Sequence, residues 1–365
     1  MRSNLKKFLS LSLTLALVLA LILSACSSGQ SDPTPSAEPS PSQEPSPSLD
    51  PVERTKINLA VLSGPTGVGA AKLMADNENG LTANDYTVTV CTDNQQVMAG
   101  LTNGDFDVAA IATNVASNLY HKSQGGIQIA AINTLGVLYI LGPADKPLTS
   151  LADLAGKTLY ATGQGANPEY VLRYLLAKNG VDPDGDVEVV WQAAEEVTAT
   201  MLQGQGEYCM LPVPAATALE AKSEGKIVSQ ISLSDVWEQL RNGSQLTMGC
   251  MVVRTEFAQE NHGAVDLFLE EYKASVEYMA DPVNMAVSSD LNPAELVAKY
   301  EIAPSSAIAG KAIPQCNLIY LDGADLRAAI QGYYEVLYAA DPASIGGSIP
   351  DDGFYFEPRL IAQWS

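Results

Sequence analysis

From Lys56 onward, short apolar runs alternate along the chain with patterns typical of amphipathic helices. The runs KINLAVL, from residue 56, and DYTVTVC, from residue 85, have the length and β-branched content of buried strands, and a helical pattern follows each of them. The alternation restarts after residue 143. It therefore predicts an α/β protein with mostly parallel sheets that carry helices on both faces.

The restart of the pattern predicts two lobes. After the strand-like run LTMGCMVV, which begins at residue 246, long helical patterns follow and no new α/β series starts. We therefore expect the chain to return to the first lobe, which would comprise residues 55–143 and 247–365, with residues 144–246 as the second lobe. Two lobes joined by two chain crossings would form a clamshell with a cleft between them.

Residues 1–25 have the parts of a secretory signal peptide. Arg2, Lys6 and Lys7 precede the apolar run of residues 8–23, and small residues then lead to Cys26. This end resembles a bacterial lipobox, which implies that Cys26 is lipidated and becomes the new N-terminus. The alternative is an uncleaved membrane anchor, but the apolar run is shorter than the roughly 20 residues that span a bilayer.

Residues 26–54 comprise Cys26 and a segment rich in Pro and Ser. The segment has too few apolar residues to bury a core, and its prolines favour extended backbone. It is therefore predicted to be a semi-rigid tether. Together with the lipid it would hold an extracytoplasmic protein at the bacterial cell membrane.

The charge of the chain excludes one class of partner. The sequence has 20 Lys and Arg against 42 Asp and Glu, a net charge of −22. Nucleic-acid binding needs basic patches, so it is excluded. Anionic lipids would not attract this chain, so the acyl anchor must supply membrane attachment.

Cysteine and histidine usage argues against a metal site and against histidine-based catalysis. Cys91, Cys209, Cys250 and Cys316 stand in apolar runs without CxxC spacing, and only two histidines are present. We expect no metal and no cofactor. An extracytoplasmic compartment permits disulfides, so the sequence leaves open whether these cysteines are paired, although buried thiols are favoured.

Two glycine-rich stretches each follow a strand-like run and open a helical pattern. They are SGPTGVGAAKLM, from residue 63, and TGQGANPEYVLRYLL, from residue 162. Ala70 stands where a P-loop needs lysine, and both stretches break the dinucleotide fingerprint at the position that packs helix on strand. Neither stretch is therefore a convincing nucleotide site.

The same stretches are still suited to contact another ligand, because helix starts offer free backbone N–H groups at the carboxyl ends of strands. The alternative is that their glycines only form tight turns. The candidate ligand-binding residues are Ser63, Gly64, Pro65, Thr66, Gly67, Thr113, Asn114, Gly163, Gln164, Gly165, Ala166, Asn167, Trp191, Glu195, Pro212 and Val213.

The expected ligand is a small, flat, polar organic molecule rather than nitrate. Trp191 could stack on a flat ring, and Glu195 could accept a hydrogen bond from an amine or heterocyclic N–H. The alternative for Glu195 and Glu196 is that they occupy the first turn of a helix, where the dipole favours acids. The loops contain no arginine, so a sulfonate would depend on backbone amides.

The segment SLADLAGKTLYATGQGANPEYVLRYLLAKNGVDPDGDVEVVW, from residue 150, resembles the substrate-binding proteins of ABC importers. The similar group takes up sulfonates, nitrate and pyrimidine thiamine precursors. MLQGQGEYCMLPVPAATAL, from residue 201, and NGDFDVAAIA, from residue 103, match further family segments. Glu207 stands at the usual Asp position, and Val213-Pro214 replaces the common Glu-Pro.

This resemblance runs from about Lys56 to Asn284 and implies a periplasmic-binding-protein fold of type II. It implies a monomeric, non-catalytic receptor that delivers a sulfonate or a pyrimidine-like molecule to an ABC permease with its ATPase. One alternative is an enzyme on the same fold, such as a menaquinone-pathway dehydratase or a pyrimidine synthase. The synthase would need a cysteine cluster and an active-site histidine, which are not visible. Another alternative is a lipoprotein that senses a ligand.

Overall fold

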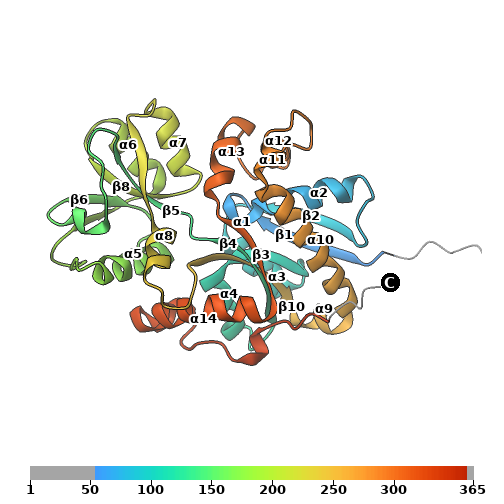
Figure 1. Ribbon diagram of the computed structural model, residues 1–365. Coiled ribbons are helices and arrows are strands. Elements are labelled where there is room, and N and C mark those ends of the chain that lie inside the picture. The colour runs from blue at the N-terminus through green and yellow to red at the C-terminus, as the bar shows by residue number, and fades with distance from the viewer. Residues whose placement is uncertain (1–53, 360–365) are drawn as a thin grey trace, which may run out of the picture. The chain divides into compact units, whose positions relative to one another are not determined.

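The computed structural model describes residues 54–359. These residues form two α/β lobes, each built on one sheet with helices packed against it (Figure 1). The predicted signal peptide, Cys26 and the tether lie outside the described residues. Among the described residues, no helix is long and apolar enough to cross a membrane.

The first lobe contains a six-stranded sheet. Its strands are β1 (Lys56–Leu62), β2 (Asp85–Cys91), β3 (Val108–Ala112), β4 (Ile127–Leu135), β10 (Thr247–Arg254) and β11 (Leu318–Leu321). Their order is β11-β4-β10-β3-β1-β2. The first four strands of the chain run in one direction, while β10 and β11 run against them. The sheet is therefore mixed, because β10 is inserted antiparallel between β3 and β4, and the expectation of a mostly parallel sheet is wrong for this lobe.

Helices pack on both faces of this sheet. The helices of the first lobe are α1 (Pro65–Val68), α2 (Ala71–Glu78), α3 (Asn94–Asn103), α4 (Thr113–Lys122), α9 (Thr255–Glu260), α10 (His262–Ala280), α11 (Pro282–Met285), α12 (Pro293–Lys299), α13 (Ser306–Ala312) and α14 (Gly323–Ala340), of which α11, α12 and α13 pack on other helices. Helices α2 and α10 share one apolar cluster with the sheet, while α3, α4 and α14 share another. Burial on both faces explains why β1 is apolar almost throughout.

The second lobe contains a five-stranded sheet. Its strands are β5 (Leu138–Pro143), β6 (Thr158–Ala161), β7 (Glu188–Trp191), β8 (Tyr208–Pro212) and β9 (Ile227–Ser232), and its helices are α5 (Asn167–Lys178), α6 (Ala194–Leu202), α7 (Ala215–Lys222) and α8 (Leu233–Gln239). The order is β7-β6-β8-β5-β9. Only β5 runs against the others.

The sheet pairing places the first chain crossing earlier than the sequence suggested. The expected first lobe extended to residue 143, but β5 pairs with β8 and β9 in the second sheet. The chain therefore crosses between β4 and β5, and it returns between α8 and β10. The apolar pattern of β5 fits either sheet, because both sheets are buried on both faces, so only the long-range pairing decides.

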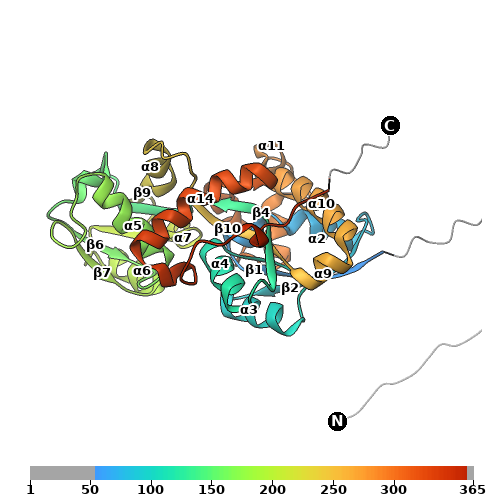
Figure 2. The same ribbon diagram turned by 90° about the horizontal axis from the view of Figure 1, so that it is seen from below.

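The C-terminal helix α14 joins the two lobes. It packs on β4 and β10 in the first lobe and on α5 in the second, and it lies across both of them in Figure 2. Side chains from both lobes consequently belong to one apolar cluster, in which Trp237 of α8 lies 5.2 Å from Tyr174 of α5 and 6.2 Å from Tyr333 of α14, measured between ring centroids. The lobes thus share a core on this side.

Candidate functional site

The strand-to-helix loops that the sequence marked as candidates all lie at the carboxyl ends of strands. Residues 63–64 follow β1, Thr113 follows β3, and residues 162–166 follow β6. Residues 192–193 and 213–214 follow β7 and β8. This is the edge at which open α/β sheets bind ligands.

In the first glycine loop, the backbone N–H of Gly64 is already hydrogen-bonded to a carbonyl of the protein. Gly64 has a φ of 103°, and its N–H donates to the carbonyl oxygen of Ile302 at 2.9 Å. The Ser63 hydroxyl donates to the same oxygen at 3.2 Å. Helix α1 spans only four residues and begins with Pro65, which has no N–H. This loop therefore presents few free donors.

The first loop also takes part in an apolar contact between the lobes. Gly64, Pro65 and Val68 lie against Val213 and Pro214 of the second lobe, and the contact is completed by the first-lobe side chains Val297, Ile302, Ala303, Ala309, Ala312, Ile313 and Cys316. The space that remains is about 10 Å³, which is barely enough for one water. The structure thus brings the expected residues Gly64, Pro65 and Val213 together in a packed junction.

A hydrogen bond supports the same junction. The Tyr139 hydroxyl on β5 donates to the Gln315 carbonyl of the first lobe at 3.0 Å. Burial, with a contribution from Asp235, raises the pKa of Tyr139 to about 12. The phenol therefore stays neutral and remains a donor at physiological pH.

In the second glycine loop, the Glu169 carboxylate accepts a backbone hydrogen bond from Gly165. Gly163 and Gly165 have φ values of 91° and 70°, as the turn requires. The N–H of Gly165 donates to Glu169 Oε2 at 2.7 Å, and the N–H of Ala166 donates to the Gly163 carbonyl at 3.2 Å. The expectation that this loop offers Gly165 N–H freely to a ligand is therefore not met, because Glu169 holds it.

Asn167, the first residue of α5, reaches the other lobe. Its side-chain amide nitrogen lies 2.9 Å from the sulfur of Met248 on β10. The residue is 5 % exposed, and its Oδ1 has no hydrogen-bond partner among the described residues. The Asn167 side chain lies near the Tyr333 hydroxyl. Burial raises the pKa of Tyr333 well above its usual value, and the neighbouring Asn167 lowers it in part. The Tyr333 hydroxyl has no hydrogen-bond partner among the described residues.

Thr113 starts α4 on the first-lobe side of the same region. Its neighbour Ala112 pairs with Gly249, which follows Met248 on β10. Thr113 is fully buried and its Oγ1 has no partner in the described part of the chain, while its carbonyl accepts the Tyr334 hydroxyl at 2.9 Å. The neighbouring Asn114 is only half-buried.

Asn133 on β4 connects the first glycine loop to α10 by hydrogen bonds, and the sequence reasoning missed it. Its amide donates to the Thr66 carbonyl at 3.1 Å and to the Tyr272 hydroxyl at 2.8 Å. A Cβ at Gly249 would lie 2.6 Å from Asn133 Oδ1, so this strand position requires glycine. The only available signal was an asparagine that interrupts the apolar run of β4.

Glu195 and Glu196 occupy the first turn of α6, as the alternative interpretation of these residues expects. Glu196 Oε2 accepts the Ala193 N–H at 3.3 Å, so this carboxylate caps α6. Glu195 is exposed, and Trp191 is half-buried against the apolar cluster shared by the lobes. Gln164 and Ala166 are exposed, and Pro212 is half-buried.

The cysteines of the described residues are free and buried, as favoured from the sequence. Burial raises the pKa of the Cys209 and Cys316 thiols to about 12. Reactive thiols have lowered pKa values, so these thiols are structural.

Both histidines are hydrogen-bonded to groups other than a thiol. His121 bonds the Ser348 carbonyl, and His262 bonds the Asp266 carboxylate. No group of three metal-ligating side chains is found within residues 54–359.

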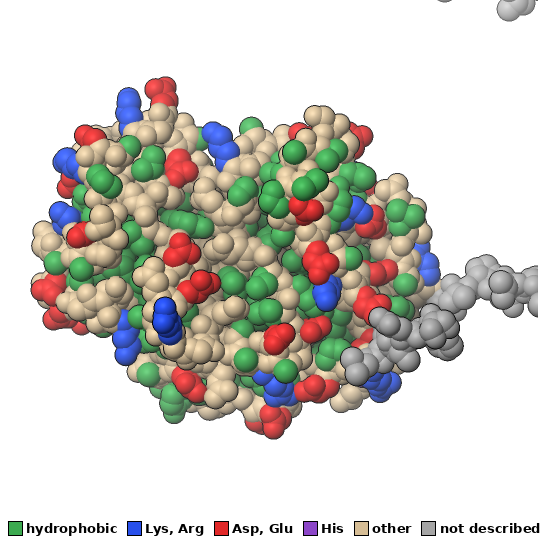
Figure 3. Space-filling view, viewed as in Figure 1, with side chains coloured by type: hydrophobic (Ala, Val, Ile, Leu, Met, Phe, Trp, Pro, Cys, Tyr) green, Lys and Arg blue, Asp and Glu red, His purple; other side chains and the backbone are tan. Residues whose placement is uncertain are grey.

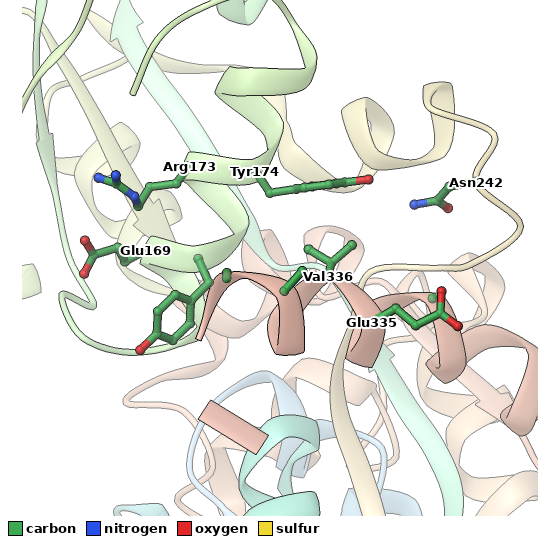
Figure 4. A pocket seen from close by; sticks show the side chains of 10 residues that line it. Glu169, Arg173, Tyr174, Asn242, Glu335 and Val336 are labelled. Carbon is green, nitrogen blue, oxygen red and sulfur yellow. The ribbon is translucent and has the colours of Figure 1, made fainter. Parts of the chain in front are cut away.

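A second feature lies on the opposite side of the lobe junction. A groove of about 580 Å³ runs between α5 and α14, and Figure 4 shows Glu169, Arg173 and Tyr174 on its α5 side. The Tyr170 hydroxyl closes one end by donating to Asp341 Oδ2 at 2.9 Å. Arg173 is engaged with Asp184 at 2.7 Å, so the groove offers no free cation from this residue.

Residues 122–284 match the model of the NMT1/THI5-like family. The matched segment spans the second lobe, the crossing strands and α10, and it falls within the segment for which the sequence resemblance was noted.

The chain is also similar to YtlA of Bacillus subtilis (strain 168), whose name is that of a binding protein. The two are 25% identical over 150 residues, which cover 40% of this chain and 44% of YtlA. The match thus spans less than half the length of that relative.

Two solved structures share the fold. One is an ABC transporter structure from Parabacteroides distasonis, with a TM-score of 0.69 and 21% identity, covering 84% of this chain and 100% of that chain. The other is the periplasmic aliphatic sulphonate binding protein SsuA from Escherichia coli, with a TM-score of 0.62 and 13% identity, covering 85% and 94%. These similarities confirm the expected two-lobed binding-protein fold.

Proposed function

We propose that this protein is an extracytoplasmic solute-binding lipoprotein. It captures a small polar organic molecule, a sulfonate or a pyrimidine-like compound, between its lobes and delivers it to an ABC permease driven by an ATPase. The candidate residues at the strand ends of both lobes contact this solute. The protein acts as a monomer and is not an enzyme.

One observation carries the proposal: loops from both lobes meet at the carboxyl edge of their sheets. Val213 and Pro214 of the second lobe pack on Gly64 and Pro65 of the first. Asn167 reaches Met248 across the same junction. A solute held by both lobes would stabilise such a closed arrangement, because closure is a hinge motion that contacts from both sides favour.

The comparisons support the same function by analogy of fold. SsuA is by name a sulphonate-binding protein, and YtlA carries the name of a binding protein. Burial raises the pKa of the Cys209 and Cys316 thiols, and His121 bonds the Ser348 carbonyl, so none of these three side chains is arranged as a nucleophile or base for the enzyme alternative. A lipid on Cys26 and the tether of residues 26–54 would keep the receptor near its permease.

The charge distribution fits a soluble ligand rather than a polyanion. Lys and Arg side chains are scattered singly among acidic ones in Figure 3, and no basic patch is formed on that face. Nucleic-acid binding would need such a patch.

The experiment that tests the proposal is a thermal-shift panel of sulfonates, pyrimidines, nitrate and amines on the full chain in detergent, followed by calorimetry. A bound compound should be recovered chemically unchanged after saturation. Conversion of any panel compound by the purified protein would favour the enzyme alternative, and absence of binding by all classes would contradict solute capture.

A further inference from the structure

The end of α14 and the segment after it are held by the first lobe. Helix α14 packs on β4 and β10. Beyond it, the short helix η3 (Pro342–Ile345) packs on α4, where the Ser117 hydroxyl donates to the Ile345 carbonyl at 2.7 Å. Asp341 lies between α14 and η3, and the Ala343 N–H donates to its Oδ1 at 3.0 Å. The Asp341 carboxylate is therefore fixed in position by first-lobe contacts.

The donor to this carboxylate comes from the second lobe. The Tyr170 hydroxyl of α5 donates to Asp341 Oδ2 at 2.9 Å, so this hydrogen bond joins the two lobes. Burial, together with Asp341, raises the pKa of Tyr170 to about 12, so the phenol remains a donor at physiological pH.

This hydrogen bond differs in kind from the other side-chain bonds between the lobes. Outside the chain crossings, those found within residues 54–359 have uncharged acceptors, the Gln315 carbonyl and the Met248 sulfur. Hydrogen bonds to a charged acceptor contribute more than those between neutral groups. The bond from Tyr170 to Asp341 should therefore be the strongest of these polar contacts.

Helix α14 is also attached to the return crossing, the chain of residues 240–246 that leads from α8 to β10. The Gln245 N–H donates to the Ala329 carbonyl of α14 at 3.1 Å. A Cβ at Gly332 would lie 2.6 Å from the Ser244 Cβ, so this close approach requires glycine. The crossing is thus bound to α14 from Ser244 onward, and rotation of the second lobe must be absorbed before that residue.

Open space separates α5 from α14 between this attachment and Asp341. The groove of about 580 Å³ lies there, with Tyr174 of α5, Val336 of α14 and Asn242 of the return crossing in its lining (Figure 4). A tightly packed interior would resist movement of one helix over the other. The groove leaves room for such movement once the bond between Tyr170 and Asp341 is released.

We propose that Tyr170 and Asp341 form a latch that holds the second lobe to the first and limits how often the lobes separate. The latch and the apolar junction at Val213 hold the lobes at different places. When the latch opens, the Tyr170 hydroxyl can donate to the Gly165 carbonyl of its own lobe, which already lies 3.5 Å away. This alternative acceptor lowers the cost of release and makes the latch reversible.

The test measures lobe separation by maleimide labelling of Cys316, which lines the apolar junction and is 1% exposed. The full chain in detergent is labelled at pH 8, and the reaction of each cysteine is quantified by mass spectrometry. Tyr170→Phe removes only the hydroxyl, and we expect it to accelerate labelling of Cys316 by about three- to tenfold, as for the loss of one hydrogen bond. Cys209, which is buried within the second lobe, should react at an unchanged rate.

A double-mutant cycle assigns the effect to this one bond. Asp341→Ala removes the acceptor and should also accelerate labelling of Cys316. The variant that combines Tyr170→Phe with Asp341→Ala should react no faster than Asp341→Ala alone, because no latch is left to lose.

The matched control is Tyr160→Phe, because the Tyr160 hydroxyl donates to the Gln205 carbonyl at 3.3 Å within the second lobe. Loss of this bond should leave the labelling rate of Cys316 unchanged. Melting temperatures of all variants establish that each is folded.

Unchanged labelling of Cys316 in both Tyr170→Phe and Asp341→Ala would overturn the inference. Accelerations that multiply in the double variant would also overturn it, since they would show two independent effects, and equal acceleration at Cys209 would do so by showing general unfolding. The measurement uses no solute, so its failure leaves the proposed solute capture to be decided by the binding panel.

Discussion

The Glu169 carboxylate accepts the backbone N–H of Gly165 at 2.7 Å, inside the loop that the sequence marked as ligand-binding. Gly165 has a φ of 70°, and the contact places a negative charge at the start of α5. The loop is therefore a closed, acidic turn. Its importance for binding can be separated from its importance for folding.

Replacing Gly165 by alanine tests whether this turn faces the solute. A Cβ at Gly165 meets no atom within 4 Å, so the substitution causes backbone strain at a φ of 70° and projects into open space. Left-handed backbone costs about 1–2 kcal/mol in a residue with a Cβ. If the solute lies there, Gly165→Ala should weaken its binding more than tenfold, or about 1.4 kcal/mol, and the bulkier Gly165→Val should weaken it further.

Gly180→Ala is the matched control, because Gly180 has a φ of 78° and equally open surroundings but ends α5. It should lower the melting temperature as much as Gly165→Ala does and leave affinity unchanged. Equal affinities of both variants would mean that the second loop is only a turn.

The apolar contact between Val213 and the α13 region should govern how easily the lobes separate. Val213→Thr keeps the side-chain shape but buries an unpaired hydroxyl, at a cost of about 1–3 kcal/mol that separation of the lobes relieves. Cys316 lines the same contact and is 1% exposed. We expect its maleimide labelling, followed by mass spectrometry at pH 8, to accelerate about tenfold.

Val187→Thr serves as the control, since Val187 is buried within the second lobe and not in that contact. It should destabilise folding without changing the labelling rate of Cys316. Equal acceleration in both variants would show that Cys316 reacts through general unfolding.

Alkaline pH should destabilise the folded state through the buried thiols. Burial raises the pKa of Cys209 and Cys316 from 9.0 to about 12, so both stay neutral in the folded chain while the unfolded chain ionises them. Their contribution is complete below pH 9 and is lost as the pH rises toward 12. Between pH 8.5 and 10, each thiol should lower the free energy of unfolding by about 1 kcal/mol.

Urea unfolding of the parent and of the Cys209→Ala, Cys316→Ala double variant at these two pH values checks this. The double variant should show the smaller decrease. The same decrease in both proteins would refute the assignment to the thiols.

Membrane attachment should depend on Cys26. The residue lies outside the described part of the chain, and the prediction rests on LSAC directly after the apolar run. Cys26→Ala should abolish metabolic labelling with palmitate and release the protein from membranes. Normal acylation of the variant would contradict the lipoprotein assignment.

The α/β architecture was predictable because each strand has its own local signal. β1 and β3 are apolar where the sheet is buried on both faces, and glycines such as Gly104, with a φ of 80°, end helices where expected. The side of the junction to which β5 belongs was not predictable. That assignment depends on pairing with β8 and β9, which follow it by tens of residues.

The positions of the strand-end loops were predictable, whereas their role in ligand binding stays a prediction. The strand-end loops were identified from glycines and helix starts, and the structure places them at the same edge of the sheets. The acceptor of Gly64 N–H, however, is Ile302, whose position depends on the fold of the whole first lobe. Glu169, only four residues from Gly165, carried a local signal that the sequence reasoning did not use.

The central claim is that a small solute closes the two lobes without being converted. The most direct test is small-angle neutron scattering of the full chain in contrast-matched detergent, with and without a saturating concentration of the panel compound that binds, and with recovery of that compound afterwards. The account predicts a smaller radius of gyration on saturation and quantitative recovery of the unchanged compound. An unchanged radius of gyration at demonstrated saturation, or a chemically altered compound, would contradict it.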